Sequence, residues 1–399
     1  MSQAKVGLGI AGIGRAFSFM IPTFRGDPRI EVMAGADPRP EARARFASDF
    51  GARAYESVEE LCANPAVDAI YIASPHQFHA PQVEIAAAHG KHVLVEKPMA
   101  LSLEECRRMI AATRKAGTHL IVGHSHSFDA PIMKTRALVA SGAYGDLRMI
   151  TAMNFTDFLY RPRRPEELDS AQGGGAVYNQ APHQVEMLRL IGGGRVKSVR
   201  AMTGMWDAAR PTEGAYTAFL TFENGCAATM TYSGYGHFDS DEFSNWIAES
   251  GLPKDPAKYG ASRAAILQSG DSARETALKN ARNYGGADYA DTSSASTRQH
   301  QQFGLVIASC ERADLRPFPD GVRIYGDLAE TFDALPPPGV PRSEVMDELV
   351  GAVCDNVAPL HSGEWSMATM EVCLALLESS RKNCEIMLQH QVGIGEVHG

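Results

Sequence analysis

A lysine and a carboxylate stand directly after a short apolar run in the first quarter of the chain. The run is Val93-Leu94-Val95, and it continues into Glu96-Lys97-Pro98. Alone, such a pair is most often a solvated charge pair at the end of a strand. In a doubly wound parallel sheet, however, ligands bind beyond the carboxyl ends of the strands. The pair is therefore a candidate for chemistry if the flanking sequence builds such a sheet.

Histidines gather around this lysine. Seven of the thirteen histidines lie between residues 76 and 126. We predict a polar, ligand-facing rim formed by the four that flank expected strand ends on one side: His76, His79, His124 and His126. Imidazoles are common metal ligands, so a metal site is an alternative interpretation. The spacings match no known ligand set, and we predict that no metal is needed.

A cluster of arginines forms the third chemical group. Arg161, Arg163 and Arg164 fall within six residues, just before the run Gly173-Gly174-Gly175. The planar guanidinium fork suits carboxylates, so this cluster predicts an acidic ligand. The alternative for each arginine is an ordinary solvated basic loop.

The first 123 residues supply the elements that would position these groups. Apolar runs at residues 6–11, 30–36, 69–73, 93–95 and 120–122 alternate with amphipathic stretches at 41–50, 80–89 and 103–116. Alternating strands and helices predict a parallel sheet with helices on both faces. The lysine then lies at the carboxyl edge of that sheet.

The turn after the first run has the spacing of a dinucleotide-binding motif. Gly12 and Gly14 allow a tight turn and close approach of the backbone to a pyrophosphate. The third position of the motif, which is normally small, is Phe17. Asp37 ends the next run, where a carboxylate accepts hydrogen bonds from ribose and repels a 2′-phosphate, so NAD is favoured over NADP. The alternatives are an ordinary turn aspartate, or NADP accommodated by Arg39.

Beyond residue 123 the pattern changes from alternating helices and strands to successive strands. A helix is expected at 130–141 and strands at 147–155, 196–206, 215–222, 226–235, 304–310 and 322–325, which indicates an antiparallel sheet. A polar region at 238–300 reads as a helical insertion that serves as a lid, a subunit contact or a loop. We predict a two-domain α/β protein. Residues 1–123 form a doubly wound, NAD-binding domain. Residues 124–399 form an α+β domain with a large, mostly antiparallel open sheet, and its C-terminal helices at 343–390 pack near the first domain.

Composition limits the possible partners. The net charge is −9 with no Lys/Arg-rich block, which argues against nucleic acid and anionic membranes as partners. No apolar run approaches the roughly 20 residues that span a bilayer. The first strand begins near Lys5, which leaves no room for a signal peptide. The seven cysteines are scattered without a CxxC spacing, so we expect a reduced, cytoplasmic protein.

Taken together, these motifs resemble the Gfo/Idh/MocA oxidoreductases. The resemblance rests on Glu96-Lys97-Pro98, the Gly12/Gly14 turn, Ala73-Ser74-Pro75 with His79, and the glycine run followed by Asn179 and His183; it covers essentially the whole chain. It implies a Rossmann domain, NAD as cofactor, an open sheet that forms a homodimer or homotetramer, and Lys97 as a catalytic, cofactor-proximal residue. The residues expected at the cofactor are Gly12, Ile13, Gly14, Arg15, Ala16, Asp37, Ser74, Pro75, His79, Glu96 and Lys97.

One departure from the family pattern affects the chemistry. The family's Asp-x-x-x-His pair is Asn179 and His183 here, and an amide cannot take a proton. We therefore expect Lys97 and His183 to share the proton of a substrate hydroxyl. The residues expected at the substrate are His76, His124, His126, Arg161, Arg163, Arg164, Asn179 and His183.

Within the family, three segments most resemble the bacterial phthalate 4,5-cis-dihydrodiol dehydrogenases: residues 74–79, 123–129 and the insertion near 242–255. The resemblance implies NAD-dependent oxidation of a cis-dihydrodiol of phthalate to the catechol, 4,5-dihydroxyphthalate, and hence a small aromatic dicarboxylate as partner. The alternatives are a sugar or inositol dehydrogenase, an NAD-dependent glycoside hydrolase, and a non-enzymatic cofactor-binding sensor.

Overall fold

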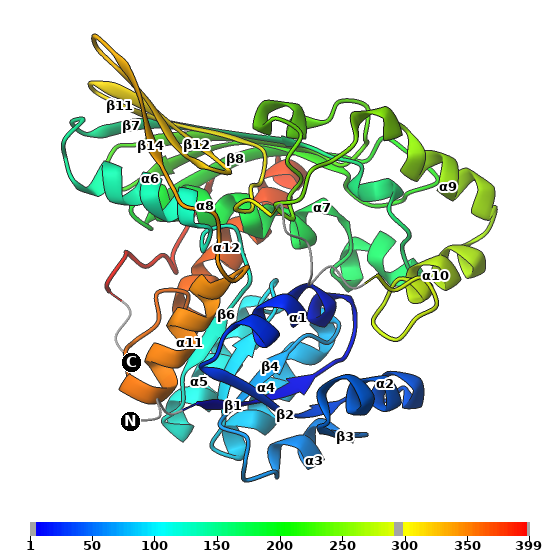
Figure 1. Cartoon of the computed structure of the whole chain (residues 1–399). Coiled ribbons are helices and arrows are strands. Elements are labelled where there is room, and N and C mark those ends of the chain that lie inside the picture. Colours follow the sequence, from blue (N-terminus) through cyan, green and yellow to red (C-terminus); the bar gives the residue numbers. More distant parts are fainter. Residues whose placement is uncertain (1–4, 291–297, 397–399) are drawn as a thin grey trace.

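Two sheets organise the protein, which is described by a computed structural model over residues 5–290 and 298–396 (Figure 1). The first sheet has six parallel strands in the order β3-β2-β1-β4-β5-β6. The second has nine strands in the order β14-β13-β12-β11-β7-β10-β9-β8-β15 and is antiparallel except where β10 pairs with β7. The predicted fold class is confirmed.

The first sheet follows the apolar runs. Its strands are β1 (Val6–Ala11), β2 (Ile30–Ala36), β3 (Arg53–Tyr55), β4 (Ala69–Ile72), β5 (His92–Val95) and β6 (Leu120–Val122). Its helices are α1 (Arg15–Gly26), α2 (Pro40–Phe50), α3 (Val58–Cys62), α4 (His79–Ala88) and α5 (Leu103–Ala116). The sequence did not predict β3, because a three-residue edge strand with no buried position has no apolar run.

The second sheet has more strands than the first, and helices pack against one of its faces. Its strands are β7 (Leu147–Phe155), β8 (Val196–Gly204), β9 (Ala215–Phe222), β10 (Ala227–Ser233), β11 (Leu305–Cys310), β12 (Ala313–Phe318), β13 (Gly321–Gly326), β14 (Glu330–Ala334) and β15 (Ile386–Met387). The helices α6 (Ala130–Ala140), α7 (Gly175–Asn179) and α8 (Ala181–Gly192) lie on one side of this sheet (Figure 1). Side chains such as Met202 and Phe219 on β8 and β9 are exposed. The short strands β12 and β14 were not predicted, because they carry charged and exposed residues.

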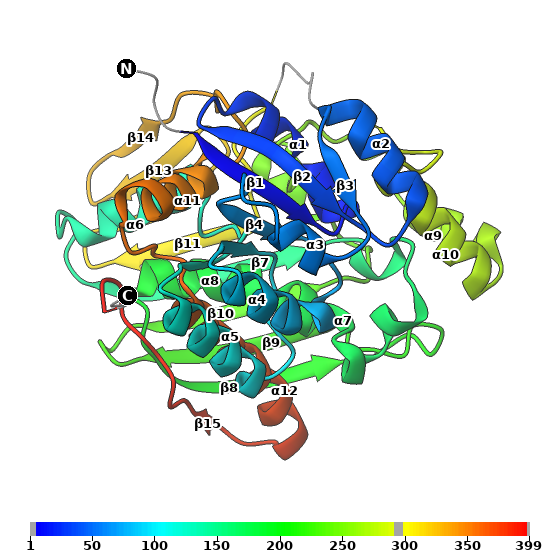
Figure 2. The same ribbon diagram turned by 90° about the horizontal axis from the view of Figure 1, so that it is seen from below.

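The polar region at 238–300 contains short helices and contacts the first sheet's helices. It holds η5 (Ser240–Ser244), η6 (Pro256–Lys258), α9 (Ala261–Ser269) and α10 (Ser272–Ala281), while residues 291–297 lie outside the described part. Tyr284 Oη donates to Asp49 Oδ2 of α2 at 2.7 Å, and Arg15 Nη1 of α1 donates to the Arg282 carbonyl at 3.2 Å. Figure 2 shows α9 and α10 beside α2. This insertion therefore bridges the two halves of the molecule.

Two C-terminal helices pack between or beside the sheets. The helix α11 (Ser343–Asp355) buries Val345, Met346 and Leu349 in the core around β1. The helix α12 (Gly363–Lys382) packs against α5 and β6 on one side and α8 and β8 on the other. Arg189 of α8 stacks 3.9 Å from the ring centre of Trp365 in α12 and donates to its carbonyl. Within the described ranges, no helix is long and apolar enough to cross a membrane.

Candidate active site

The glycine turn after β1 is shaped for a ligand phosphate. Gly12 has φ +89°, and a Cβ there would lie 2.6 Å from the Ser74 nitrogen, so only glycine fits. Gly14 caps α1 without any side-chain hydrogen bond, and nothing in the described chain lies within 4 Å of the place its Cβ would take. The first-turn N–H groups of α1 are thus available to an anion.

A cavity of about 650 Å³ opens at this turn. Most of the residues expected at the cofactor line it: Gly12, Gly14, Arg15, Ala16, Asp37, Ser74 and Pro75. Residues beyond 123 line it as well, among them Arg164, Gln172, Lys279 and Asn283. The expected substrate residue His76 also faces this cavity. Both halves of the chain therefore enclose the cofactor space.

Asp37 is buried and already hydrogen-bonded. Its Oδ2 accepts from the Ile13 nitrogen at 2.8 Å, and its Oδ1 accepts from Arg39 Nε at 2.9 Å. The arginine also donates to the Ile13 carbonyl at 2.7 Å. The carboxylate and its guanidinium partner both line the cavity, so a ligand there meets a paired charge.

Phe17 shows how a large side chain takes the third position of the glycine motif. It is fully buried, and its ring lies 5.8 Å from Phe46, 5.7 Å from Phe50 and 5.2 Å from Tyr284. The side chain fills an aromatic cluster shared by α1, α2 and the insertion. A small residue at this position usually allows close packing of helix and strand. Here the aromatic cluster holds α1 in place instead.

Lys97 lies just after β5 and is held by the second half of the chain. Its Nζ donates to the backbone carbonyl of Asn179 at 2.8 Å. Burial lowers the pKa of Lys97, although Glu96 and Glu249 oppose that effect. A lysine whose pKa is lowered exchanges a proton more readily near neutral pH.

Two residues expected at the cofactor brace the loop that carries Lys97. Tyr71 Oη donates to Glu96 Oε1 at 2.6 Å. The buried His79 ring lies 3.0 Å from both the Pro98 and the Ser74 carbonyls. Glu96 and His79 are not among the residues that line the cavity, and their contact with the cofactor stays a prediction.

Asn179 has a role that an aspartate could not fill. Its Nδ2 donates to the carbonyls of Gly173 and Gly175 at 3.2 and 2.9 Å. A carboxylate has no donor for these two bonds. The amide therefore fixes the glycine run while its own backbone carbonyl receives Lys97. Its contact with substrate stays a prediction.

His183, near the start of α8, is buried close to a second histidine. Its Nδ1 has no hydrogen-bond partner in the part of the chain that the structure describes. Its ring centre lies 4.7 Å from that of His126. Burial, and then the charge of Lys97, hold the pKa of His183 well below its usual value, so the imidazole is neutral.

His126 lies between two carboxylates. Its Nδ1 is 2.6 Å from Asp129 Oδ2, and its Nε2 is 3.7 Å from Glu249 Oε1. Asp129 Oδ1 is 3.1 Å from His124 Nε2. Burial opposes a charge on His126, but the two carboxylates outweigh burial and raise its pKa to about 8. Neither Asp129 nor Glu249 was predicted as a site residue. Asp129 stands beside the clustered histidines, which could have marked it, whereas Glu249 stands in the polar insertion without a spacing that singles it out.

The three clustered arginines separate in the fold. Arg161 Nη1 lies 3.8 Å from Glu249 Oε2, and both residues line a second cavity of about 570 Å³. Arg163 stacks 3.8 Å from the ring centre of Phe158 and donates to its carbonyl. Arg164 lines the cofactor cavity instead. Among these arginines, only Arg161 faces the group around His126.

Ligand atoms of His126, His183 and Glu249 lie within 4.8 Å of one another, a spacing that a divalent metal could use. Arg161 and Lys97 both act on the same carboxylate as positive charges. A dication would meet repulsion from them. The expectation that no metal is needed stays a prediction.

Comparisons with known proteins bear on this site. Residues 6–124 match an oxidoreductase family with an NAD-binding Rossmann fold, GFO_IDH_MocA, and residues 132–245 match the GFO/IDH/MocA C-terminal domain. The chain is 46% identical over 94% of both lengths to a 1-carboxy-3-chloro-3,4-dihydroxycyclohexa-1,5-diene dehydrogenase of Comamonas testosteroni. It is 36% identical, over 37% of this chain and 44% of the relative, to a mouse trans-1,2-dihydrobenzene-1,2-diol dehydrogenase. A crystal structure of a proposed dehydrogenase from Bordetella bronchiseptica RB50 superposes with a TM-score of 0.91 at 42% identity, covering 96% of this chain and all of that one.

Proposed function

Because the chain belongs to the Gfo/Idh/MocA family of NAD-binding oxidoreductases, we propose that it oxidises a cis-dihydrodiol of a carboxylated aromatic ring to the catechol. The 4,5-cis-dihydrodiol of phthalate, with 4,5-dihydroxyphthalate as product, is the substrate predicted from the sequence. The name of the Comamonas testosteroni relative describes a ring with one carboxyl group and two vicinal hydroxyls, which supports this class. The observation that carries the proposal is the convergence of His183, Arg161 and Lys97 on the carboxylate of Glu249.

Residues of this chain can accept the proton that the substrate hydroxyl loses in the oxidation. NAD⁺, when bound, would supply the acceptor for the hydride that leaves one carbinol carbon. Lys97, held at Nζ by the Asn179 carbonyl, takes the hydroxyl proton, and the neutral His183 imidazole is a second acceptor. Positioned proton transfer of this kind contributes roughly 10²–10⁴-fold to a rate. The ketone formed tautomerises to the aromatic catechol, so diol and NAD⁺ give catechol, NADH and one proton.

The proposal also includes the arrangement of the chain. We assign residues 1–123 to the NAD-binding domain and 124–399 to the substrate and oligomerisation domain. Met149, Met202 and Phe219, which are between 47% and 65% exposed on one face of the second sheet, support a homodimer or homotetramer. Light scattering of the wild type and of Phe219→Glu tests this, since the variant should be a smaller species.

The direct test follows NADH absorbance with a panel of alcohols. Purified protein and NAD⁺ are mixed with the phthalate 4,5-cis-dihydrodiol, a benzoate cis-dihydrodiol, the unsubstituted cis-dihydrodiol of benzene, myo-inositol and glucose. We expect the carboxylated diols to be the best substrates by kcat/KM. Turnover of inositol or glucose in preference to every diol would contradict the proposal.

A further inference from the structure

We propose that Arg161 and His126 form the subsite for a substrate carboxylate, and that Glu249 of the insertion occupies this subsite while no substrate is bound. The inference rests on the proposed function and deepens it, since it names what the site recognises. It also makes Glu249 a specificity-determining residue that competes with the substrate.

Positive groups from separate segments converge on one carboxylate. Glu249 Oε1 faces His126 Nε2 at 3.7 Å, and Glu249 Oε2 faces Arg161 Nη1 at 3.8 Å. Lys97 also acts on Glu249 as a nearby positive charge. Like charges this close together are stabilised by an anion among them. Glu249 supplies that anion from within the chain.

The two cations are fixed by other carboxylates, so they do not depend on Glu249 for their orientation. Arg161 Nε donates to Asp157 Oδ1 at 2.9 Å, and His126 Nδ1 lies 2.6 Å from Asp129 Oδ2. Both keep one face directed toward Glu249. The subsite is therefore preformed, which limits the cost of ordering it when a ligand binds.

The contacts of Glu249 itself are loose. Charge-assisted hydrogen bonds between nitrogen and oxygen are typically about 2.7–2.9 Å long. The two Glu249 contacts are 3.7 and 3.8 Å, so they are ion pairs without a close hydrogen bond. A ligand carboxylate that approaches to normal hydrogen-bond distance would replace them with stronger ones.

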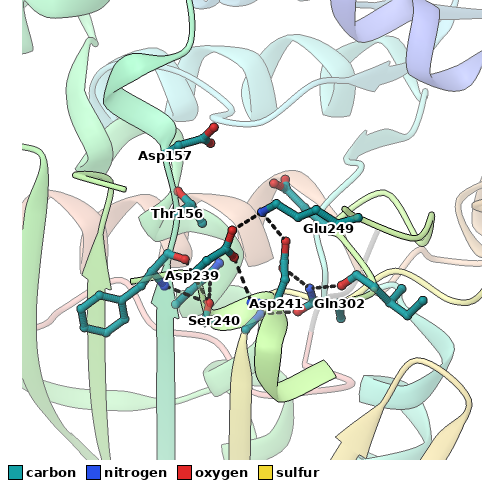
Figure 3. A network of polar contacts seen from close by, with 12 residues as sticks. Thr156, Asp157, Asp239, Ser240, Asp241, Glu249 and Gln302 are labelled. Carbon is teal, nitrogen blue, oxygen red and sulfur yellow. Dashed lines mark hydrogen bonds and ion pairs between the residues drawn. The ribbon is translucent and has the colours of Figure 1, made fainter. Parts of the chain in front are cut away.

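Glu249 lies at the tip of a turn whose base is anchored. The Ala248 nitrogen donates to the Leu252 carbonyl at 2.9 Å, and Ile247 and Pro253 form a bridge below it. Below the turn, Lys254 pairs with Asp239 and Asp241, and Gln302 donates to Asp241 at 2.6 Å. Figure 3 shows this network beside Glu249. The tip can change its side-chain position while the base stays in place.

There is room for Glu249 to move. Its side chain is 36% exposed and lines the cavity of about 570 Å³ together with Arg161. The same cavity gives a ligand a route to the arginine. Displacement of Glu249 into this space therefore needs no unfolding of the insertion.

Ligand binding can be measured without turnover. Benzoate is titrated into the NADH-bound enzyme by calorimetry, with catechol as the uncharged probe. Glu249→Gln keeps the size of the side chain and removes the competing charge, so benzoate should bind about tenfold tighter and catechol within about twofold of wild type. Arg161→Met should weaken benzoate about tenfold and leave catechol unchanged. Glu242→Gln removes the same charge from an exposed position of the insertion and should change neither ligand.

Three results would overturn the inference. The first is equal benzoate affinity in wild type and Glu249→Gln, and the second is undiminished affinity in Arg161→Met. The third is stoichiometric Co²⁺ binding with d–d absorption bands that Glu249→Gln abolishes, which would assign the cluster to a metal. The two proposals separate cleanly. Benzoate binding as expected without oxidation of any diol removes the proposed function alone, whereas diol oxidation with unchanged benzoate affinities removes this inference alone.

Discussion

The cofactor cavity and the group around Glu249 are built in opposite ways. The cofactor turn depends on backbone: a left-handed Gly12 and the uncapped start of α1 leave N–H groups facing the cavity. The other group depends on charged side chains, with Lys97, His126, Arg161 and Glu249 arriving from four separate segments. A backbone site tolerates change in its surroundings, whereas a charged cluster couples each member to the others.

The largest expected effect distinguishes the charged cluster from the cofactor turn by their separate effects on kcat and on NADH affinity. Lys97→Met should lower kcat by roughly 10²–10⁴-fold, because it removes the proton acceptor. NADH affinity, measured by fluorescence, should stay within about twofold, because the phosphate turn is untouched. Residual turnover near the wild-type rate would remove Lys97 from its proposed role, and a parallel loss of NADH affinity would show that the regions are not separable.

A pair of glycine variants tests the backbone character of the cofactor turn. Gly12→Ala should lower the free energy of unfolding by about 1–3 kcal/mol, because the new Cβ would lie 2.6 Å from the Ser74 nitrogen at a φ of +89°. Gly14→Ala should leave the stability of the apoprotein nearly unchanged, since its Cβ meets open space. Denaturant unfolding without cofactor checks both. Equal losses in the two variants would contradict the contrast.

The pH dependence of stability probes the charged cluster. The pKa of His126 is raised from 6.5 to about 8, so its contribution to folding is complete below the unfolded value and is lost as pH rises through about 8. The stability difference between wild type and His126→Asn should therefore be larger at pH 6 than at pH 9, by about 2 kcal/mol. Denaturant titrations at the two pH values measure it. A difference that grows toward alkaline pH would have the wrong sign.

The smallest expected effect concerns the junction between the regions. Asn179→Asp should lower the free energy of unfolding by about 1–2 kcal/mol, because both hydrogen bonds from Nδ2 to glycine carbonyls are lost. The variant restores the acid typical of the resembled family, yet we expect kcat to fall, since the carbonyl that holds Lys97 shifts. Unfolding and steady-state kinetics check this. An increase in both stability and kcat would contradict the bracing role.

Local signals made the cofactor side predictable. Gly12, Asp37 and Lys97 each stand at the end of an apolar run, and parallel strands bring such ends to one edge of a sheet. The turn itself needs a positive φ, and a glycine at that place in the sequence indicates one. The same reasoning missed β3 and β14, because short exposed edge strands have little apolar pattern.

The charged cluster was less accessible to sequence reasoning. Arg161, Arg163 and Arg164 are neighbours in the chain, yet only the first faces Glu249. Glu249 itself lies 66 positions beyond His183, in a polar region without strong periodicity. Its partners depend on how the insertion folds back across β7, and no short-range rule specifies that path.

The insertion touches both ligand spaces. Tyr284 and Lys279 meet the NAD-binding side, and Glu249 meets the carboxylate subsite. A segment in contact with both sites is a physical route by which one affinity can depend on the other, and thermodynamics requires any such dependence to be mutual. If bound NAD⁺ changes the affinity for an acidic ligand by some factor, the acidic ligand must change the affinity for NAD⁺ by the same factor.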